Sequence, residues 1–131
     1  MRVIGDYDGA YNVYWPAPTE QVQRSHGDLQ ESTEYGAYAL AILLVVALTP
    51  YTVIERSRIG TGFDYWLGHP NDLPFNRKGR LEASGILKGT IPSLKARARN
   101  KSAQMDLTNA VLPGYAVVVE FGEPVAQVVE K

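Results

Sequence analysis

The feature that most restricts how this chain can fold is a long stretch without any charged side chain. Residues 35–54 are 20 consecutive uncharged residues. Ser32 or Thr33 can cap a helix before this stretch, and Pro50 ends it. A helix that is apolar nearly all round has to be covered on several sides, so residues 33–48 are predicted to form a buried core helix.

The same stretch is long enough to cross a bilayer, but we expect no membrane segment. Its purely apolar part, residues 39–48, is only ten residues long. Apolar runs of that length are typical of buried core helices. The first eight residues carry acidic side chains and no apolar run, unlike a secretory signal. The chain also contains no cysteine, which excludes disulfides and cysteine nucleophiles and fits a cytoplasmic location.

The segments after this helix predict an α/β (α+β) domain with a mixed central sheet. Three strand patterns follow, then a helix with Pro92 in its first turn, and then a β-branched run typical of a buried strand. Polar and apolar side chains alternate from Arg80 to Ser84, which places Arg80, Glu82 and Ser84 on one face of the third strand. The expected strands are residues 51–57, 63–67, 80–87, 115–121 and 125–129, and the expected second helix is residues 91–107.

The length of the chain, 131 residues, fits one domain. Tyrosines interleave with Gly, Asp, Asn and Pro in residues 1–30, which are predicted to be an N-terminal arm packed on the domain, irregular or with a short hairpin. Residues 31–131 are predicted to be a single α/β core domain.

Two acidic residues occupy adjacent predicted strands, Asp64 in the second and Glu82 in the third. If these strands pair, the two carboxylates come together at one end of the sheet, where they can hold a hard divalent cation such as magnesium. Bound magnesium activates water and offsets charge on a phosphodiester. The alternative is structural: Asp64 bonds the Gly-rich turn of residues 59–62, and Glu82 pairs with Arg80 or with a cation of the second helix.

The positive charges of the chain are concentrated in one segment. The net charge is −1, yet residues 77–101 hold eight basic side chains and only Glu82 as an acid, which gives +7. Clustered cations are typical of phosphate binding, whereas the alternative is a solvated basic surface balanced by the acidic N-terminal segment. The candidate nucleic-acid-binding residues are Arg77, Lys78, Arg80, Arg97, Arg99 and Gln104.

The element order and the spacing Asp64…Glu82-Ala83-Ser84 resemble the PD-(D/E)XK nuclease superfamily. That superfamily has a helix, three strands, a helix and a strand as its core, with an acid in the second strand and Glu-x-Lys in the third. The resemblance spans about residues 30–122 and implies a restriction-endonuclease-like fold that binds or cleaves nucleic-acid phosphodiesters with magnesium. Glu34 matches an additional acid that many members place on the first helix, and it joins Asp64 and Glu82 as an implied metal ligand.

The chain departs from that signature at Ser84, which stands where the superfamily has lysine. A serine cannot supply the positive charge of an ammonium group. Members of the superfamily relocate this lysine, so the resemblance implies a catalytic set of Asp64 and Glu82 with Lys95 or Lys101. Lys78 is a further candidate if the third strand begins early. Two blocks, residues 60–68 and 80–85, also look similar to uncharacterised small bacterial proteins.

The first hypothesis is therefore a magnesium-dependent nuclease-like domain. If no lysine reaches the acids, the alternative is a non-catalytic interaction or assembly protein on a degenerate nuclease fold, bound to a second copy or to a larger protein. Its contacts would be the last strand, left uncovered, and the aromatic side chains of the arm. A small-molecule enzyme is a third hypothesis, for which no motif names a cofactor. The arm aromatics are Tyr7, Tyr11, Tyr14 and Trp15.

Overall fold

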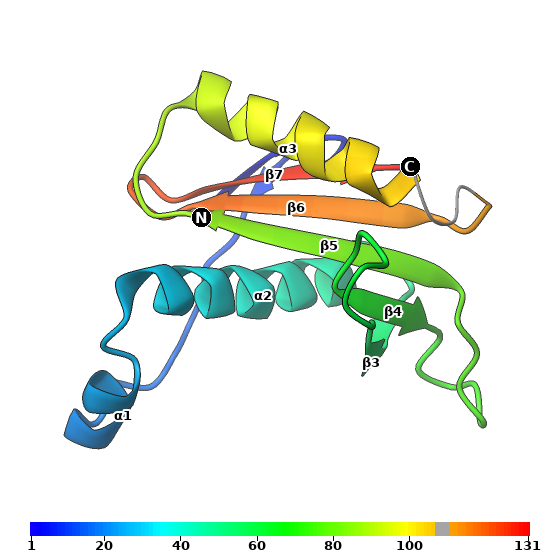
Figure 1. The fold of residues 1–131 in the computed structure, drawn as a ribbon, viewed down its shortest axis with the longest axis horizontal. Helices are drawn as coiled ribbons and strands as arrows, with labels where there is room; N and C mark the ends of the chain where they lie inside the picture. Colours follow the sequence, from blue (N-terminus) through cyan, green and yellow to red (C-terminus); the bar gives the residue numbers. More distant parts are fainter. Residues whose placement is uncertain (107–110) are drawn as a thin grey trace.

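In the computed structural model, which describes residues 1–106 and 111–131, a mixed sheet lies between two long helices. Figure 1 shows α2 against one face of the sheet and α3 against the other. The described strands run across the sheet in the order β2-β1-β7-β6-β5-β4-β3. The elements are β1 (Arg2–Gly5), β2 (Gly9–Ala10), α1 (Glu20–Ser25), α2 (Leu29–Leu48), β3 (Thr52–Arg56), β4 (Tyr65–Gly68), β5 (Gly79–Ile86), α3 (Ile91–Asp106), β6 (Gly114–Glu120) and β7 (Val125–Glu130).

The predicted order of helix, three strands, helix and strand is confirmed from α2 to β6. β3, β4 and β5 form an antiparallel meander, and β5 then pairs in parallel with β6. α3 makes the connection that a parallel pair requires. The predicted terminal strand is also present, since β7 pairs with β6 in antiparallel. The end predicted for the second helix, Leu107, lies outside the described residues.

α2 begins four residues earlier than predicted, because Asp28 caps it rather than Ser32 or Thr33. The Asp28 side chain accepts a hydrogen bond from the backbone N–H of Glu31 at 2.8 Å. The Thr33 hydroxyl instead donates to the carbonyl of Leu29, as expected inside a helix. α2 has a length and apolarity that membrane-spanning helices also have. Only one side of the helix is buried against the sheet, through Ala37, Ala41, Leu44 and Val45, so the expectation that it is covered on several sides is wrong.

α2 and β5 approach each other closely at Gly85. A Cβ atom on Gly85 would lie 2.7 Å from the carbonyl oxygen of Thr33 and 3.2 Å from the Cβ of Ala37. Only a glycine facing small helix residues permits this spacing. The close approach fixes the height of α2 over the sheet and therefore the position of Tyr38, one residue further along the helix.

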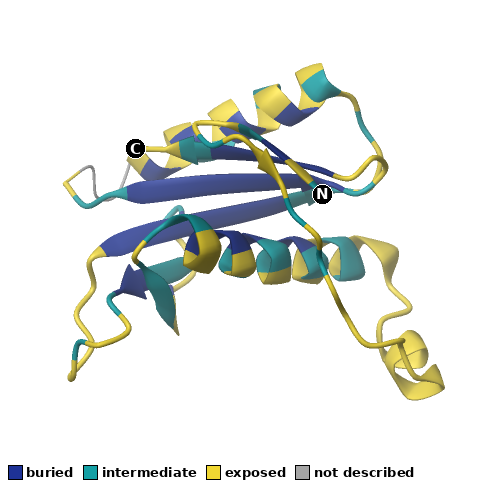
Figure 2. Ribbon diagram, turned by 180° about the vertical axis from the view of Figure 1, so that it is seen from behind, coloured by how far each residue is buried: buried dark blue, intermediate teal, exposed yellow. Residues whose placement is uncertain are grey.

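The N-terminal residues form the short hairpin that the sequence allowed, and this hairpin belongs to the main sheet rather than to an irregular arm packed on it. β1 is a strand of the main sheet, parallel to β7 and paired with the short β2. β7 therefore lies between β6 and β1, so the expectation that the last strand is uncovered is wrong. Beyond β2 the chain is extended as far as α1, all six residues of which are exposed (Figure 2).

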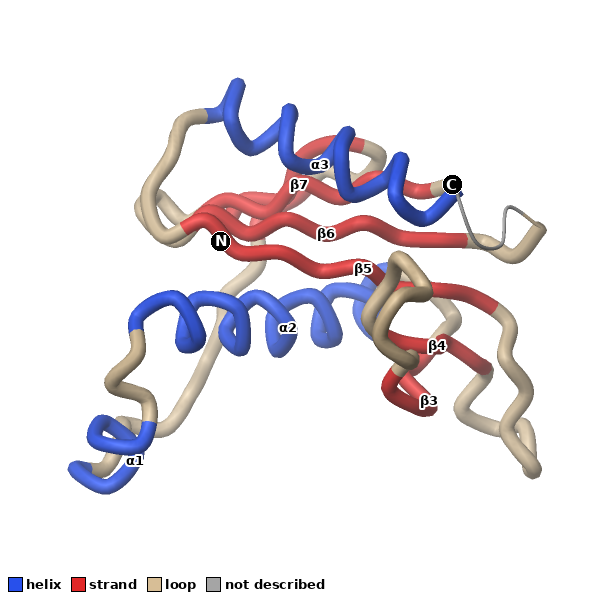
Figure 3. Tube along the Cα trace, in the orientation of Figure 1, coloured by secondary structure: helices blue, strands red, loops and turns tan. Residues whose placement is uncertain are grey.

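The core lies on both faces of the central strands, which are largely buried (Figure 2). Side chains alternate as predicted: Leu81 and Ala83 of β5 join the core cluster beneath α2, while Glu82 faces α3. Figure 3 shows that β4 and β3 extend from β5 beyond the part of the sheet that α3 covers.

Candidate active site

Asp64 lies directly before β4, where that strand begins to pair with β5. Its backbone N–H donates to the carbonyl of Leu81, and its carboxylate accepts a hydrogen bond from the backbone N–H of Ala83, both at 2.8 Å. The Asp64 side chain thus accepts a hydrogen bond from the backbone of β5, and not from the Gly-rich turn that precedes Asp64. In that turn Gly60 and Gly62 adopt positive φ angles of 92° and 82°, and the hydroxyls of Ser57 and Thr61 lie 2.5 Å apart.

Glu82 is brought next to Asp64 by the pairing of β4 with β5, as the sequence predicted. The Glu82 side chain is only 7% exposed, and its Oε1 lies 3.0 Å from Nζ of Lys101 on α3. Lys101 is thus the lysine that the structure brings to the acids. Lys95 is exposed, and among the described residues it has no side-chain partner. Lys78 precedes β5 and is likewise exposed, so the early start of that strand is not observed.

The contacts between β5 and α3 follow a regular spacing. Residues two apart on the strand meet residues four apart on the helix, because two strand residues rise about 6.6 Å and four helix residues about 6 Å. The same strand face thus positions three different groups along one helix. These contacts are Arg80 Nη1 to the Met105 carbonyl at 2.6 Å, Glu82 Oε1 to Lys101 Nζ at 3.0 Å, and Ser84 Oγ to Arg97 Nη1 at 3.1 Å.

The electrostatics of the site are dominated by the proximity of two acids. Burial first, and then the charge and hydrogen bonding of Asp64, raise the pKa of Glu82 to about 7, although the nearby ammonium of Lys101 acts to lower it. Ionising both carboxylates therefore costs free energy in the isolated chain. A cation that approached the pair would lower that cost.

The implied metal ligands do not all come together. Among residues 1–106 and 111–131, no group of three or more His, Asp or Glu side chains is placed to hold a metal. Glu34 is exposed on α2 and lines a surface depression of about 410 Å³ with Thr33, Gly85 and Arg97. The candidate metal ligands that converge are therefore Asp64 and Glu82.

The eight cations of residues 77–101 do not form one face, contrary to the simplest expectation from their clustering. Arg80 is 1% exposed, and its guanidinium donates to the carbonyls of Met105 and Leu112. It is therefore structural and not available to a polymer. Arg77 stacks on Trp66 and pairs with Glu55 at 2.5 Å.

The second helix retains the accessible part of the basic segment. Arg97 lies next to Ser84, one helical turn from Lys101. Arg99 and Gln104 are exposed on α3, away from the contacts that β5 makes. The helix therefore offers cations beside the acids and on its outer side.

Sequence reasoning did not single out Arg56 as a residue of the site. Its guanidinium lies 5.0 Å from the ring centre of Tyr38 and 4.9 Å from that of Tyr65, and it donates to the Tyr65 hydroxyl at 3.1 Å. Its Nη2 is 3.8 Å from Oδ1 of Asp64. No local pattern indicated this, because Tyr38 comes from α2 and the other residues from β3 and β4.

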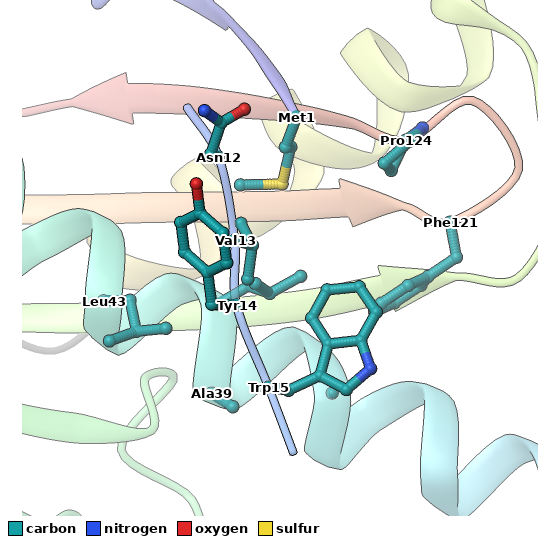
Figure 4. A pocket seen from close by; sticks show the side chains of 11 residues that line it. Met1, Asn12, Val13, Tyr14, Trp15, Ala39, Leu43, Phe121 and Pro124 are labelled. Carbon is teal, nitrogen blue, oxygen red and sulfur yellow. The ribbon is translucent and has the colours of Figure 1, made fainter. Parts of the chain in front are cut away.

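A second concave feature lies on the α2 side of the sheet, opposite the face from which Lys101 comes. It is an apolar groove of about 810 Å³ between the extended arm and α2. Figure 4 shows Tyr14 and Trp15 of the arm between Leu43 on the left and Phe121 on the right. Tyr14 and Trp15 remain 86% and 73% exposed.

No protein-family model, no curated protein and no solved structure matches this chain. What the chain does therefore has to be read from its own site.

Proposed function

We propose that this chain is a metal-dependent nuclease-like domain that binds nucleic-acid phosphodiesters and cleaves them. The observation that carries the proposal is the pair of acids, Asp64 and Glu82, held on neighbouring strands with Lys101 3.0 Å from Glu82. The order of elements from α2 to β6 supports a restriction-endonuclease-like fold, and the absence of cysteine supports a cytoplasmic location.

The residues present fit a magnesium ion. Magnesium in proteins is bound through one or two carboxylates, with water and substrate phosphate as its other ligands, so two acids are a sufficient set. Burial and the neighbouring charge of Asp64 keep the pKa of Glu82 raised in spite of the Lys101 ammonium, and a divalent cation at the pair would favour the ionised carboxylate. Magnesium held by Asp64 and Glu82 would activate water and offset the charge of the phosphodiester.

Lys101 takes the role that Ser84 cannot perform. It comes from the helix rather than the strand, yet its ammonium reaches the same acid. Arg97, one turn away, presents its guanidinium to Ser84 and is partly open to solvent. We assign Lys101 to the reacting phosphate and Arg97 to a neighbouring phosphate of the strand, because a guanidinium binds phosphate through two parallel donors.

Cleavage of labelled DNA and RNA, with and without magnesium, tests the proposal. Asp64→Asn and Glu82→Gln should each reduce cleavage by about 100-fold or more, since each removes a charge that acts on the reacting phosphate. Lys101→Met should reduce it by about 100-fold. Lys88→Met, which removes an exposed lysine from the loop before α3, is the matched control and should cut like the parent.

The acid variants should still bind the polymer in EDTA, because each removes a negative charge near phosphate. A parent protein that is inert with magnesium and manganese, and that binds no nucleic acid at low salt, would refute the proposal. Residual binding without cleavage would leave a nucleic-acid-binding domain that has lost its chemistry.

The apolar groove favours a second candidate, an assembly role in which the chain pairs with a second copy of itself. The same face of the molecule carries both an apolar groove along α2 and the exposed rings of Tyr14 and Trp15. A two-fold dimer requires such self-complementarity, since each copy offers the same surface to the other.

A further inference from the structure

Arg56 is fixed in place to an extent that is unusual for a half-exposed arginine. Its side chain is 54% exposed, yet the guanidinium lies about 5 Å from the ring centres of both Tyr38 and Tyr65. The Tyr65 hydroxyl accepts a hydrogen bond from it at 3.1 Å. Stacking on two rings restricts the rotamers of Arg56 before any ligand is present. Binding a ligand therefore costs less side-chain entropy than it does for a free arginine.

The tyrosines are themselves held by the fold. The rings of Tyr38 and Tyr65 pack edge to face, with centres 6.0 Å apart, and both side chains contact the core cluster beneath α2. Tyr35, one turn back on α2, packs on Tyr38 in the same manner at 6.2 Å. The position of Arg56 is thus set by α2 and β4 together, not by its own strand alone.

The donors of Arg56 are not saturated. A guanidinium has five N–H groups, more than two tyrosine hydroxyls accept. The nearest atom of Asp64 lies at 3.8 Å, which is beyond hydrogen-bond distance. Arg80 also has an Nε–H without a hydrogen-bond partner, but its guanidinium is buried against two carbonyls and is closed to a ligand, while Arg77 pairs closely with Glu55.

We infer that Arg56, clamped between Tyr38 and Tyr65, is a phosphate-binding residue that positions a nucleic-acid strand at Asp64. This inference rests on the proposed function for the identity of the ligand. It adds a cation from β3 to those from α3, so that the acids are flanked by Arg56 on one side and Lys101 on the other. The planar, permanently charged guanidinium of Arg56 would donate two parallel hydrogen bonds to two phosphate oxygens.

The direct test uses inorganic phosphate as the probe and NMR of the Nε–Hε groups of the arginines. The Arg56 signal, assigned by its loss in Arg56→Lys, should shift and saturate as phosphate is added. The control is Arg2, an exposed arginine of β1 near the other edge of the sheet, whose signal should not saturate. Asp64→Asn should bind phosphate more tightly at Arg56, because it removes the nearest negative charge.

The second test measures binding of a short single-stranded oligonucleotide in EDTA. Arg56→Gln should weaken binding by about tenfold and reduce the slope of log affinity against log salt by about 0.7, as expected for one lost phosphate contact to a single strand. Arg2→Gln should change affinity by less than twofold. Arg56→Lys should recover part of the loss, because it restores the charge without the fork.

The outcomes separate this inference from the proposed function. An Arg56 signal that does not respond to phosphate overturns the inference, even if the protein cleaves nucleic acid. A saturable Arg56 response in a protein that neither binds nor cleaves nucleic acid supports the phosphate site and refutes the proposed function. A melting temperature of Arg56→Gln close to that of the parent shows that the effect on binding is not a loss of fold.

Discussion

Glu82 is a residue that lowers the stability of the fold when it is ionised but that the proposed chemistry requires as a carboxylate. Its carboxyl is buried beside Asp64, and burial together with that charge raises its pKa from an ordinary 4.5 to about 7. An apolar residue at this position would avoid the cost. An acid there is instead what a cation-binding site requires, which is why strongly perturbed acids concentrate at functional sites.

The pH dependence of stability tests this account of Glu82. A carboxyl with a higher pKa in the folded state binds its proton more tightly there, so its contribution to stability falls as pH rises from about 4.5 to about 7 and is then constant. Glu82→Gln removes this contribution. The melting temperature of the variant relative to the parent should therefore rise by several degrees between pH 5 and pH 8, as thermal melts would show.

The exposed acid Glu123 supplies the control for that measurement. Glu123→Gln in the turn between β6 and β7 should melt with the same offset from the parent at both pH values. An offset for Glu82→Gln that also stays constant from pH 5 to pH 8 would contradict the raised pKa.

At the scale of elements, the pairing of β5 with α3 is what assembles the site. The strand supplies a polar residue at every second position, and the helix supplies a partner at every fourth. Arg80 is at one end of this series of strand–helix contacts. Its guanidinium donates to the carbonyl of Met105 in the last turn of α3. A cation at a helix C-terminus also interacts favourably with the helix dipole.

Replacement of Arg80 should therefore destabilise the whole domain. Arg80→Met fills a similar volume but removes the hydrogen bonds that Arg80 donates to the carbonyls of Met105 and Leu112, and we expect it to lower the free energy of unfolding by about 3 kcal/mol. Urea denaturation measures this value. Arg99→Met, on the exposed side of α3, is the matched control and should change it by less than about 0.5 kcal/mol. A loss below about 1 kcal/mol for Arg80→Met would show that the capping role is minor.

At the scale of the whole molecule, the sheet separates two surfaces of different character. The face with α3 carries the acids and cations, whereas the face with α2 carries the apolar groove beneath the N-terminal arm (Figure 4). Leu43 and Val46 of α2 are more than half exposed there. Exposed apolar surface that is continuous with a groove is typical of an interaction site.

Pairing through this groove predicts a dimer whose formation depends on the arm. Multi-angle light scattering should give twice the chain mass of 14.4 kDa for the parent and a monomer for Trp15→Ser. Val22→Ser, on the exposed helix α1, removes an apolar side chain elsewhere and should leave the dimer intact. If the parent protein is a monomer at high protein concentration, the proposal that the groove mediates self-association is refuted.

The sequence predicted most of the core because the relevant signals are local. The alternation of β5 from Arg80 to Ser84 follows the two-residue period of a strand, and the continuous β-branched run of β6 is typical of a strand buried on both faces. The apolar run predicted the α2 helix but not that only one of its sides is buried. The approach of Glu82 to Asp64 followed from strand order alone. The sequence could not choose between Lys95 and Lys101, since both lie on the same basic helix.

The tertiary structure decided what depends on residues far apart in the chain. It selected Lys101 through the spacing of β5 against α3, buried Arg80 under the end of that helix, and placed β1 beside β7. It also brought Tyr38 of α2 onto Arg56. A charge pattern along the sequence does not distinguish a buried arginine from a free one, because the distinction depends on which carbonyls and rings the fold brings within reach.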